Sequence, residues 1–217
     1  MAAIFQPGAN LAAKLAFIAI GAAFTGVLAW WFTWQRTDWE RRTGFILEQP
    51  VPFSHQHHVA GLGIDCRFCH TSVEVSPSAG MPPTYTCMTC HSQIWTNAAM
   101  LAPVRQSLAD ATPLVWNRTN NLPQYVYFNH GIHIAKGVGC SECHGHVDRM
   151  ALTDKEEPFT MAFCLNCHRH PGPRLRPAGE IFNTEWRRTD STPSPEELLR
   201  QYGIPNRDLT DCSICHR

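Results

Sequence analysis

The sequence predicts a mostly irregular fold in which short α-helices follow one N-terminal transmembrane helix. A Cys-x-x-Cys-His motif occurs five times and accounts for all ten cysteines of the 217-residue chain. An uncharged run of 20 residues extends from Leu15 to Trp34. The rest of the chain is rich in Pro and Gly, and no long amphipathic pattern lies between the motifs. A long helix is therefore expected only near the N-terminus.

The five motifs have the spacing used to attach c-type haem. In that chemistry the two thiols form thioethers to the porphyrin, and the adjacent histidine ligates the iron. The cysteines are Cys66, Cys69, Cys87, Cys90, Cys140, Cys143, Cys164, Cys167, Cys212 and Cys215. The histidines are His70, His91, His144, His168 and His216. Five covalently bound haem c groups are therefore expected, so the fold class is a multihaem cytochrome c whose short helices wrap around five haems.

Structural zinc and disulfides are the alternative interpretations of the same cysteines. Zinc ribbons combine two Cys-x-x-Cys pairs into one four-ligand site, and five motifs cannot pair without a remainder. Disulfides suit an even number of cysteines in an exported protein. Neither alternative explains why a histidine follows every second cysteine, which favours haem.

The uncharged run is long enough to cross a bilayer as a helix. Trp30, Trp31 and Trp34 lie at one end of it, where an aromatic belt is expected. A cleavable signal peptide ending near Ala29 is the alternative, but the length of the run favours an uncleaved anchor. Small residues spaced three and four apart favour contact with another membrane helix. These are Ala12, Ala16, Ala19, Ala23 and Gly26.

Haem attachment also predicts the orientation of the chain in the membrane. Thioether formation takes place on the outer side of the energy-coupling membrane. We therefore expect a single-pass protein of the cytoplasmic (inner) membrane, with its N-terminus inside and the haem domain on the outer, periplasmic side. The formal net charge is zero, so the composition gives no indication of nucleic acid binding.

Three parts are expected along the chain: an anchor over residues 1–35, a juxtamembrane linker over 36–52, and a pentahaem cytochrome c domain over 53–217. The 183 residues beyond the uncharged run provide about 37 per haem, too few for a conventional apolar core around each one. The haems themselves are therefore expected to form the core. Residues 92–127 are expected to cover a haem edge or, as the second choice, to face a partner.

One short helix is predicted near the C-terminus. Ser194 can cap it, Pro195 and two glutamates suit its first turn, and Gly203 can end it.

A repeated Phe-x-His-x-x-His unit supplies candidates for the second axial ligands. The unit spans Phe53–His58 and again Phe128–His133, each shortly before a haem motif, which indicates an internal repeat. We expect its histidines to be distal iron ligands. These are His55, His58, His130 and His133.

The fifth distal ligand is left open by the sequence. His57 and a methionine are the favoured choices, and a methionine ligand would raise the potential of its haem relative to two histidines. The complete set of candidates is His57, His146, His170, Met150 and Met161. Of these, His57 and Met161 are included among the predicted metal ligands.

The haem units are similar to those of class III multihaem cytochromes, and the whole chain resembles the pentahaem membrane-anchored cytochrome c component of alternative complex III. In the class III proteins the first histidine of the unit serves the following haem and the second serves a different one. The residues that carry the resemblance are Phe53–His58, Gly80–Gln93, Tyr127–His130, Cys143–Gly145 and Cys212–Arg217.

The resemblance implies an electron-transfer subunit of a quinol-oxidising membrane complex, without substrate chemistry of its own. Its expected partners are polytopic membrane subunits that bind quinol, an iron–sulfur subunit, a monohaem cytochrome c subunit or soluble electron carrier, and membrane lipid. The alternatives are the haem subunit of a related quinone-reducing complex and a stand-alone membrane-anchored quinol dehydrogenase. A multihaem reductase is disfavoured, because no Cys-x-x-Cys-Lys motif occurs.

Overall fold

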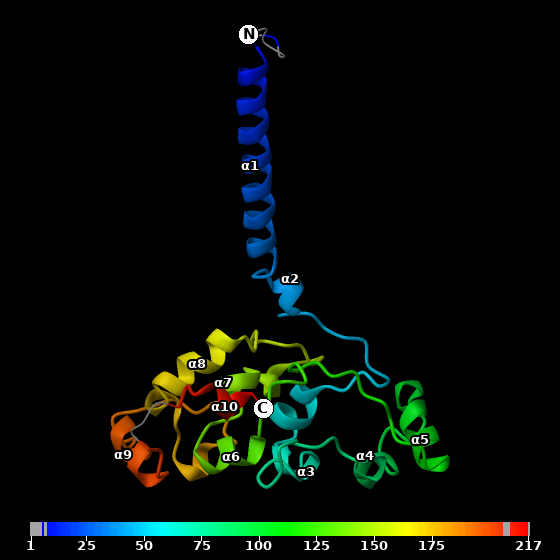
Figure 1. Cartoon of the computed structure of the whole chain (residues 1–217). Coiled ribbons are helices and arrows are strands. Elements are labelled where there is room, and N and C mark those ends of the chain that lie inside the picture. Colours follow the sequence, from blue (N-terminus) through cyan, green and yellow to red (C-terminus); the bar gives the residue numbers. More distant parts are fainter. Residues whose placement is uncertain (1–5, 7, 206–208, 217) are drawn as a thin grey trace. The chain divides into compact units, whose positions relative to one another are not determined.

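The computed structural model describes residues 6, 8–205 and 209–216. The chain forms two compact units, Met1–Arg42 and Thr43–Arg217, drawn in Figure 1. Their boundary falls inside the predicted linker over 36–52. The first residues of the predicted anchor, 1–5 and 7, and the last residue of the predicted haem domain lie outside the described residues.

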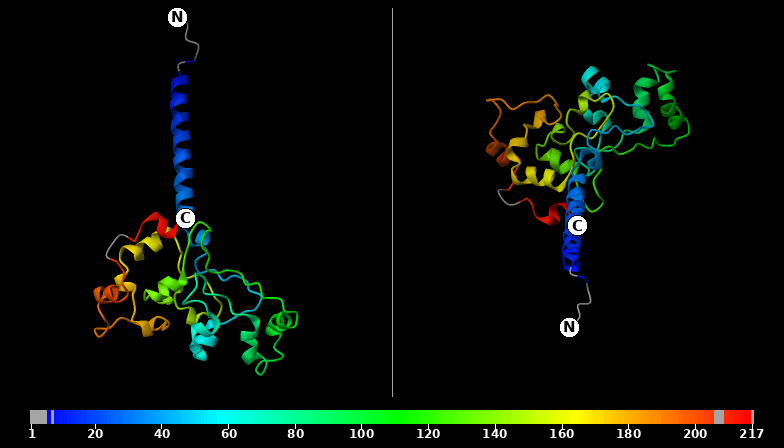
Figure 2. Two further views of the ribbon diagram at one scale, coloured as in Figure 1. Left: turned by 60° about the horizontal axis from the view of Figure 1, so that its bottom comes forward. Right: turned by 90° about the horizontal axis from the view of Figure 1, so that it is seen from above.

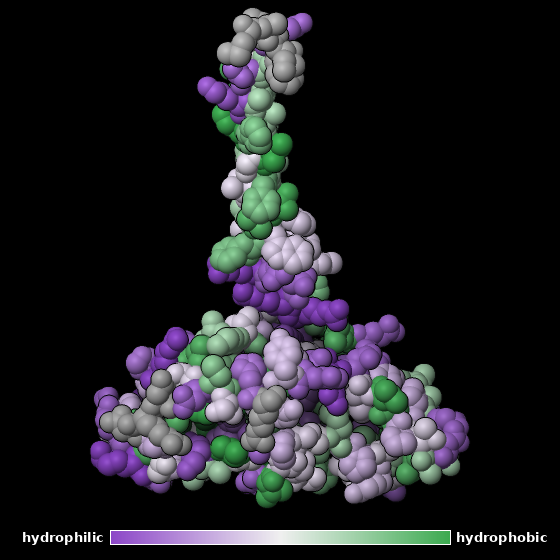
Figure 3. Space-filling model, in the orientation of Figure 1, coloured by the Kyte–Doolittle hydropathy of each residue, from purple (hydrophilic) through white to green (hydrophobic). Residues whose placement is uncertain are grey.

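The first unit consists of a long helix, α1 (Ala9–Trp34), and a short one, α2 (Asp38–Arg41). Helix α1 is long and apolar enough to cross a membrane, and Figure 3 shows hydrophobic side chains along it. Its Thr25 and Thr33 hydroxyls donate hydrogen bonds to carbonyls of the preceding turn, at 2.9–3.0 Å. These polar groups are therefore satisfied within the helix, as a lipid environment requires. Helix α1 is a candidate membrane anchor.

The second unit is built from short helices joined by irregular chain, as Figures 1 and 2 show. Its α-helices are α3 (Cys66–Cys69), α4 (Thr84–His91), α5 (Ala102–Ala109), α6 (His130–Ala135), α7 (Ser141–His144), α8 (Met161–Arg169), α9 (Pro195–Gln201) and α10 (Cys212–Cys215). A π-helical turn, η1 (Gln56–Gly61), and the 3-10 turns η2 (Ala99–Leu101), η3 (Val147–Arg149), η4 (Gly172–Arg174) and η5 (Ala178–Glu180) complete the set. Over the described residues, extended pairing is limited to two isolated bridges. The predicted mixture of short helices and irregular chain is confirmed.

Little apolar side-chain area is buried in this unit. The described residues contain eight buried hydrophobic side chains: Val51, Val73, Leu101, Val104, Ile134, Leu175, Ile181 and Leu198. Two small clusters account for six of them. The chain therefore lacks the continuous core that a domain of this size usually forms from its own side chains.

One of the clusters includes side chains from the segment 92–127. Leu101 and Val104 pack against Cys87 and Met88 of the second motif, so this segment packs on that motif. Helix α5, which carries Val104, was not expected from the sequence. The Thr84 and Ser107 hydroxyls, 2.6 Å apart, join α4 to α5.

Helix α9 forms where the sequence predicts it. Ser194 Oγ accepts from the Glu197 amide at 3.2 Å, and Glu197 Oε2 accepts from the Ser194 amide at 2.7 Å, which makes a capping box. Gly203 follows with φ of 57°, the left-handed conformation that ends helices.

A buried arginine connects this C-terminal segment to the third motif. Arg176 is 3% exposed, and its guanidinium donates to Ser141 Oγ at 2.6 Å and to Glu142 Oε1 at 2.9 Å. A Cβ on Gly139 would collide with the Arg176 side chain, so glycine is required there. The Tyr202 hydroxyl donates to the Arg176 carbonyl at 2.6 Å. Residues 176 and 202 thereby fix the start of α7.

We predict that Leu198→Ala destabilises this unit, because the Leu198 side chain on α9 is fully buried. The free energy of unfolding should fall by about 2–5 kcal/mol, the range for truncation of a buried leucine. Denaturant unfolding followed by circular dichroism measures it. Leu108→Ala on α5 is the matched control, because Leu108 is 46% exposed. Equal losses in the two variants would contradict the assignment of Leu198 to a core.

Candidate functional site

The two Phe-x-His-x-x-His units have almost the same geometry. The Phe53 ring meets His55 edge-on at 4.9 Å and stacks on His58 at 4.4 Å. The Phe128 ring meets His130 edge-on at 4.8 Å and stacks on His133 at 4.4 Å. The internal repeat inferred from the sequence is therefore also a structural repeat.

The same local hydrogen bonds hold both units. Ser54 Oγ accepts from the amide of His57, and Asn129 Oδ1 accepts from the amide of Ile132 at the equivalent position. The Asn129 bond is the N-cap of α6, and the Ser54 bond is made just before η1. The backbone carbonyls of Ser54 and Asn129 then bind Nδ1 of the last histidine in each unit, at 2.8 Å for His58 and 2.7 Å for His133.

Three of the predicted distal histidines face a motif histidine. The ring centroids of His58 and His91 are 6.2 Å apart, those of His130 and His144 are 6.3 Å apart, and those of His133 and His168 are 6.2 Å apart. Two imidazoles that ligate one metal ion from opposite sides have centroids about 6 Å apart, because each metal–nitrogen bond is about 2 Å and each ring nitrogen is about 1.1 Å from its ring centre. These three pairs fit an iron between their rings.

The fourth predicted distal ligand, His55, has His70 as a charged neighbour. Burial lowers the pKa of His55 to about 4, and the His70 ring adds to this effect, followed by His58 and His144. Burial likewise lowers the pKa of His144 to about 4 and lowers that of His133. A neutral imidazole is the form that ligates a metal, so these environments suit ligand histidines.

Each of these histidines, together with His70 and His216 of the first and fifth motifs, has its Nδ1 in a hydrogen bond, which leaves Nε2 as the ligand atom. For the distal set, Thr153 Oγ1 lies 2.9 Å from His55 Nδ1, and the Pro77 carbonyl lies 2.8 Å from His130 Nδ1. For the motif set, the partners are the carbonyls of Gly80 (His70), Ile94 (His91), Leu209 (His168) and Tyr125 (His216), at 2.7–3.3 Å, and the Asn120 side chain (His144) at 3.1 Å. Such outer bonds fix the tautomer and orientation of ligand histidines.

The His144 bond indicates how the Asn120 amide is oriented. Its Nδ2 faces His144 Nδ1, while its Oδ1 is buried without a hydrogen-bond partner. The reversed amide would place Oδ1 against His144 Nδ1–H, giving this histidine the same tautomer as the others.

The remaining candidate ligands lie in other surroundings. His57 is exposed and stacks on Trp95 at 5.8 Å. Met161 is 62% exposed at the start of α8, and His170 is exposed after its end. The Met150 carbonyl accepts from the Gln56 amide. Over the described residues, the His216 ring contacts no second histidine and stacks on Tyr125 at 5.8 Å, so the fifth distal ligand stays open.

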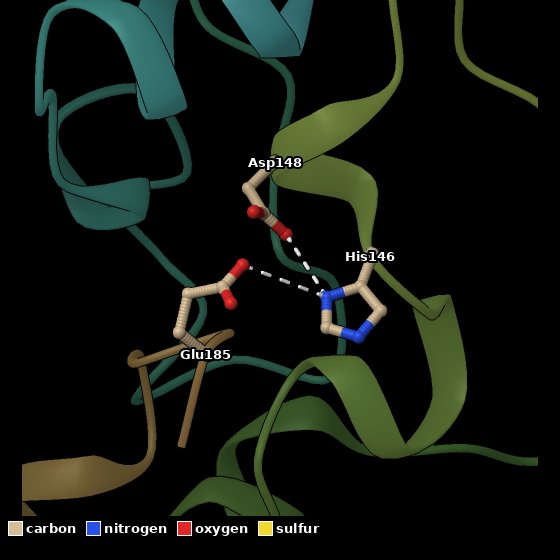
Figure 4. Close-up of side chains that lie close together, drawn as sticks. All are labelled: His146, Asp148 and Glu185. Atoms are coloured by element: carbon tan, nitrogen blue, oxygen red, sulfur yellow. Dashed lines mark ion pairs between the residues drawn. The ribbon is translucent and has the colours of Figure 1, made fainter.

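His146, the last of these candidates, belongs to a polar cluster with Asp148 and Glu185, shown in Figure 4. His146 Nδ1 lies 3.7 Å from Asp148 Oδ1 and 4.0 Å from Glu185 Oε1. Arg149 makes a bidentate ion pair with Glu185, and Arg187 lies 3.5 Å from His146 Nε2. Arg149 thus pairs with both carboxylates, at 3.9 Å from Asp148 and through the bidentate contact with Glu185, and Arg187 lies against the histidine.

No two of the ten cysteines, all of which are among the described residues, form a disulfide. They lie close to one another between motifs as well as within them. The Cys66 thiol, for example, hydrogen-bonds to the Cys140 thiol, which lowers the pKa of Cys66 to about 7 and raises that of Cys140. Burial raises the pKa of Cys143 to about 12. The arrangement brings thiols from different motifs together without disulfides.

Comparison with known proteins identifies one relevant relative. The chain is 33% identical over 103 residues to the multihaem cytochrome c subunit of menaquinone reductase from Nitratidesulfovibrio vulgaris (strain Hildenborough). The match covers 47% of this chain and 48% of the relative, so it spans about half the length of each. No protein-family model matches the chain. The chain thus has a homologue that is the multihaem cytochrome c subunit of a menaquinone reductase.

We predict that His58→Ala and His133→Ala each disturb one iron, because each ring faces a motif histidine at 6.2 Å. About a fifth of the haem should become high spin or take a foreign ligand. Optical and electron paramagnetic resonance spectra of the haem-loaded protein measure this change.

Ile132→Ala is the contrasting variant, because Ile132 directly precedes His133 but its side chain is 58% exposed and is no candidate ligand. Its spectrum should stay low spin. Unchanged spectra for both His58→Ala and His133→Ala would remove these residues from the ligand set.

Proposed function

We propose that this chain binds five haem c groups and serves as the electron-transfer subunit of a membrane quinol:acceptor oxidoreductase, alternative complex III. The observation that carries the proposal is the set of three histidine pairs with centroids 6.2–6.3 Å apart, each with Nδ1 already bonded. The multihaem subunit name of the relative supports haem and a quinone-linked role. Bound haem iron supplies single-electron exchange.

The residues have distinct roles in this proposal. The ten motif cysteines hold the groups covalently, and each motif histidine provides one axial ligand. His55, His58, His130 and His133 provide four of the second ligands. Four irons with both axial positions filled offer no open site to a substrate, and no motif has lysine in place of its histidine, so we assign electron relay and no enzymatic reaction to this chain.

The membrane arrangement follows from α1. This helix would anchor the chain in the cytoplasmic membrane, with the N-terminus inside and the haem unit outside, where thioethers are formed. Its small-residue stripe from Ala12 to Gly26, all exposed, would pack against the polytopic quinol-binding subunits. An iron–sulfur subunit would deliver electrons, and a monohaem cytochrome c or another carrier would accept them.

A second candidate function is the haem subunit of a quinone-reducing complex. The name of the relative, a menaquinone reductase, favours it. The two candidates share the haem unit and the membrane anchor, and they differ in the direction of electron flow.

We predict five covalent haems per chain, because all five motifs are complete. A pyridine haemochrome assay against protein concentration counts them, and haem staining after denaturing electrophoresis shows covalent attachment. Replacing Cys212 and Cys215 with serine should remove one haem and leave four. A wild-type count of four or fewer would contradict the proposal.

We predict that the isolated haem-loaded chain exchanges electrons with small redox mediators but does not oxidise quinol, because the proposed quinol site lies on other subunits. Stopped-flow absorbance of the haem bands measures both reactions. The complex isolated in mild detergent provides the positive control. Steady quinol turnover by the single chain would instead establish a stand-alone quinol dehydrogenase. Net quinone reduction by the complex with a reduced carrier, without the reverse reaction, would favour the quinone-reducing complex.

A further inference from the structure

We propose that the five attachment motifs lie in space in the order second, first, third, fourth, fifth, so that the second and fifth motifs are the two ends of the relay. This inference rests on the proposed function and adds the order in which electrons pass between the haem motifs. It follows from contacts between motif residues that are far apart in the sequence.

The first repeat unit joins the first and second motifs. Phe53 contacts both His55 and His58, so the two distal histidines share one anchor. His58 faces His91 of the second motif, with ring centroids 6.2 Å apart. The His58 carbonyl also accepts from the amide of Ile64, two residues before Cys66, so the residue that faces the second motif is tied directly to the start of the first.

The first motif also contacts the third. Cys140 packs on the cluster that contains Val73, three residues after the first motif. His130, which faces His144 of the third motif, is held by the Pro77 carbonyl through both its amide and its Nδ1. The loop that follows the first motif thus positions a ligand of the third.

The second repeat unit joins the third and fourth motifs, just as the first unit joins the first and second motifs. Phe128 contacts His130 and His133, which face His144 and His168 respectively.

The fifth motif attaches to the fourth. His168 Nδ1 lies 2.9 Å from the Leu209 carbonyl, which comes just before Cys212. Burial raises the pKa of the Cys164 thiol, and the Cys215 thiol of the fifth motif adds to it. Helix α10 lies beside α8 in the views of Figures 1 and 2.

The second motif lies at one end of the proposed order, because protein covers the side of it that faces away from the first motif. Leu101 and Val104 of the segment that contains α5 pack on Cys87 and Met88. In Figures 1 and 2, α4 and α5 lie together at one end of the second unit, with α3 between them and the helices of the third and fourth motifs. The first motif in the sequence is therefore internal in the path, and partners exchange electrons through the second and fifth.

A photoreduction experiment on the full haem-loaded chain tests this order. All ten cysteines belong to the motifs, so Ala162→Cys adds the one thiol free to take a ruthenium polypyridyl photoreductant. Ala162 is exposed on α8, near the fourth and fifth motifs. In this background, His130→Met, His55→Met and His58→Met each make one haem the electron trap, because a methionine ligand raises its potential.

Time-resolved absorbance after a flash gives the arrival time at the trap. We expect it to lengthen from His130→Met to His55→Met to His58→Met. Earlier arrival in His58→Met than in His55→Met would overturn the order. Ile132→Met, an exposed position on α6, is the matched control that adds a methionine without removing a ligand, and it should create no trap.

A second measurement keeps the test decisive if a methionine fails to ligate its iron. Iron–iron distances from a structure of the isolated complex should show the third motif closer to the first than to the second. The reverse would overturn the order. The haem count separates this failure from that of the proposed function: fewer than five haems refutes both, whereas five haems in another order refutes the order alone.

Discussion

The hydrogen bond at histidine Nδ1 is the interaction on which the arrangement of the second unit depends. For seven of the nine histidines that make it, the partner is a backbone carbonyl, so it is fixed by the course of the chain and not by a side-chain rotamer. Several of these bonds span long stretches of sequence, as between His168 and Leu209. The bond that orients a ligand therefore also fixes a loop, and the ligand geometry and the fold are set together.

The repeat unit explains how so short a chain can support a relay. Within six residues it provides a phenylalanine, two histidines and a helix cap, and each histidine faces a different motif. Two neighbouring sites are thus joined by one rigid element, with Phe53 or Phe128 between the two rings. The join between the repeats is different, because it is made by long-range contacts such as Cys140 with the cluster that contains Val73, and Pro77 with His130.

Local signals in the sequence predicted the local features well. The apolar run gave α1, Ser194 and Gly203 gave the limits of α9, and the repeated unit was visible as a pattern of residue types. The sequence could not show that Trp95 stacks on His57, because that contact brings together residues from separate segments. Helix α5 was missed because its few apolar residues, such as Val104, form no long periodic pattern and pack on a distant motif.

The sparse apolar packing gives the segment around Arg176 a special role. Leu175 and Leu198 are the two fully buried side chains among the described residues, and Tyr202 and Arg176 lie next to them in a hydrogen-bonded brace. Lys136, just after α6, donates to the Tyr202 carbonyl at 2.7 Å, and Arg176 holds Ser141 of α7. The brace therefore fixes the ends of both helices that carry the His130 and His144 pair. These buried side chains lie at the middle of the proposed order. Displacement of the His130 and His144 pair there would separate the second and first motifs from the fourth and fifth.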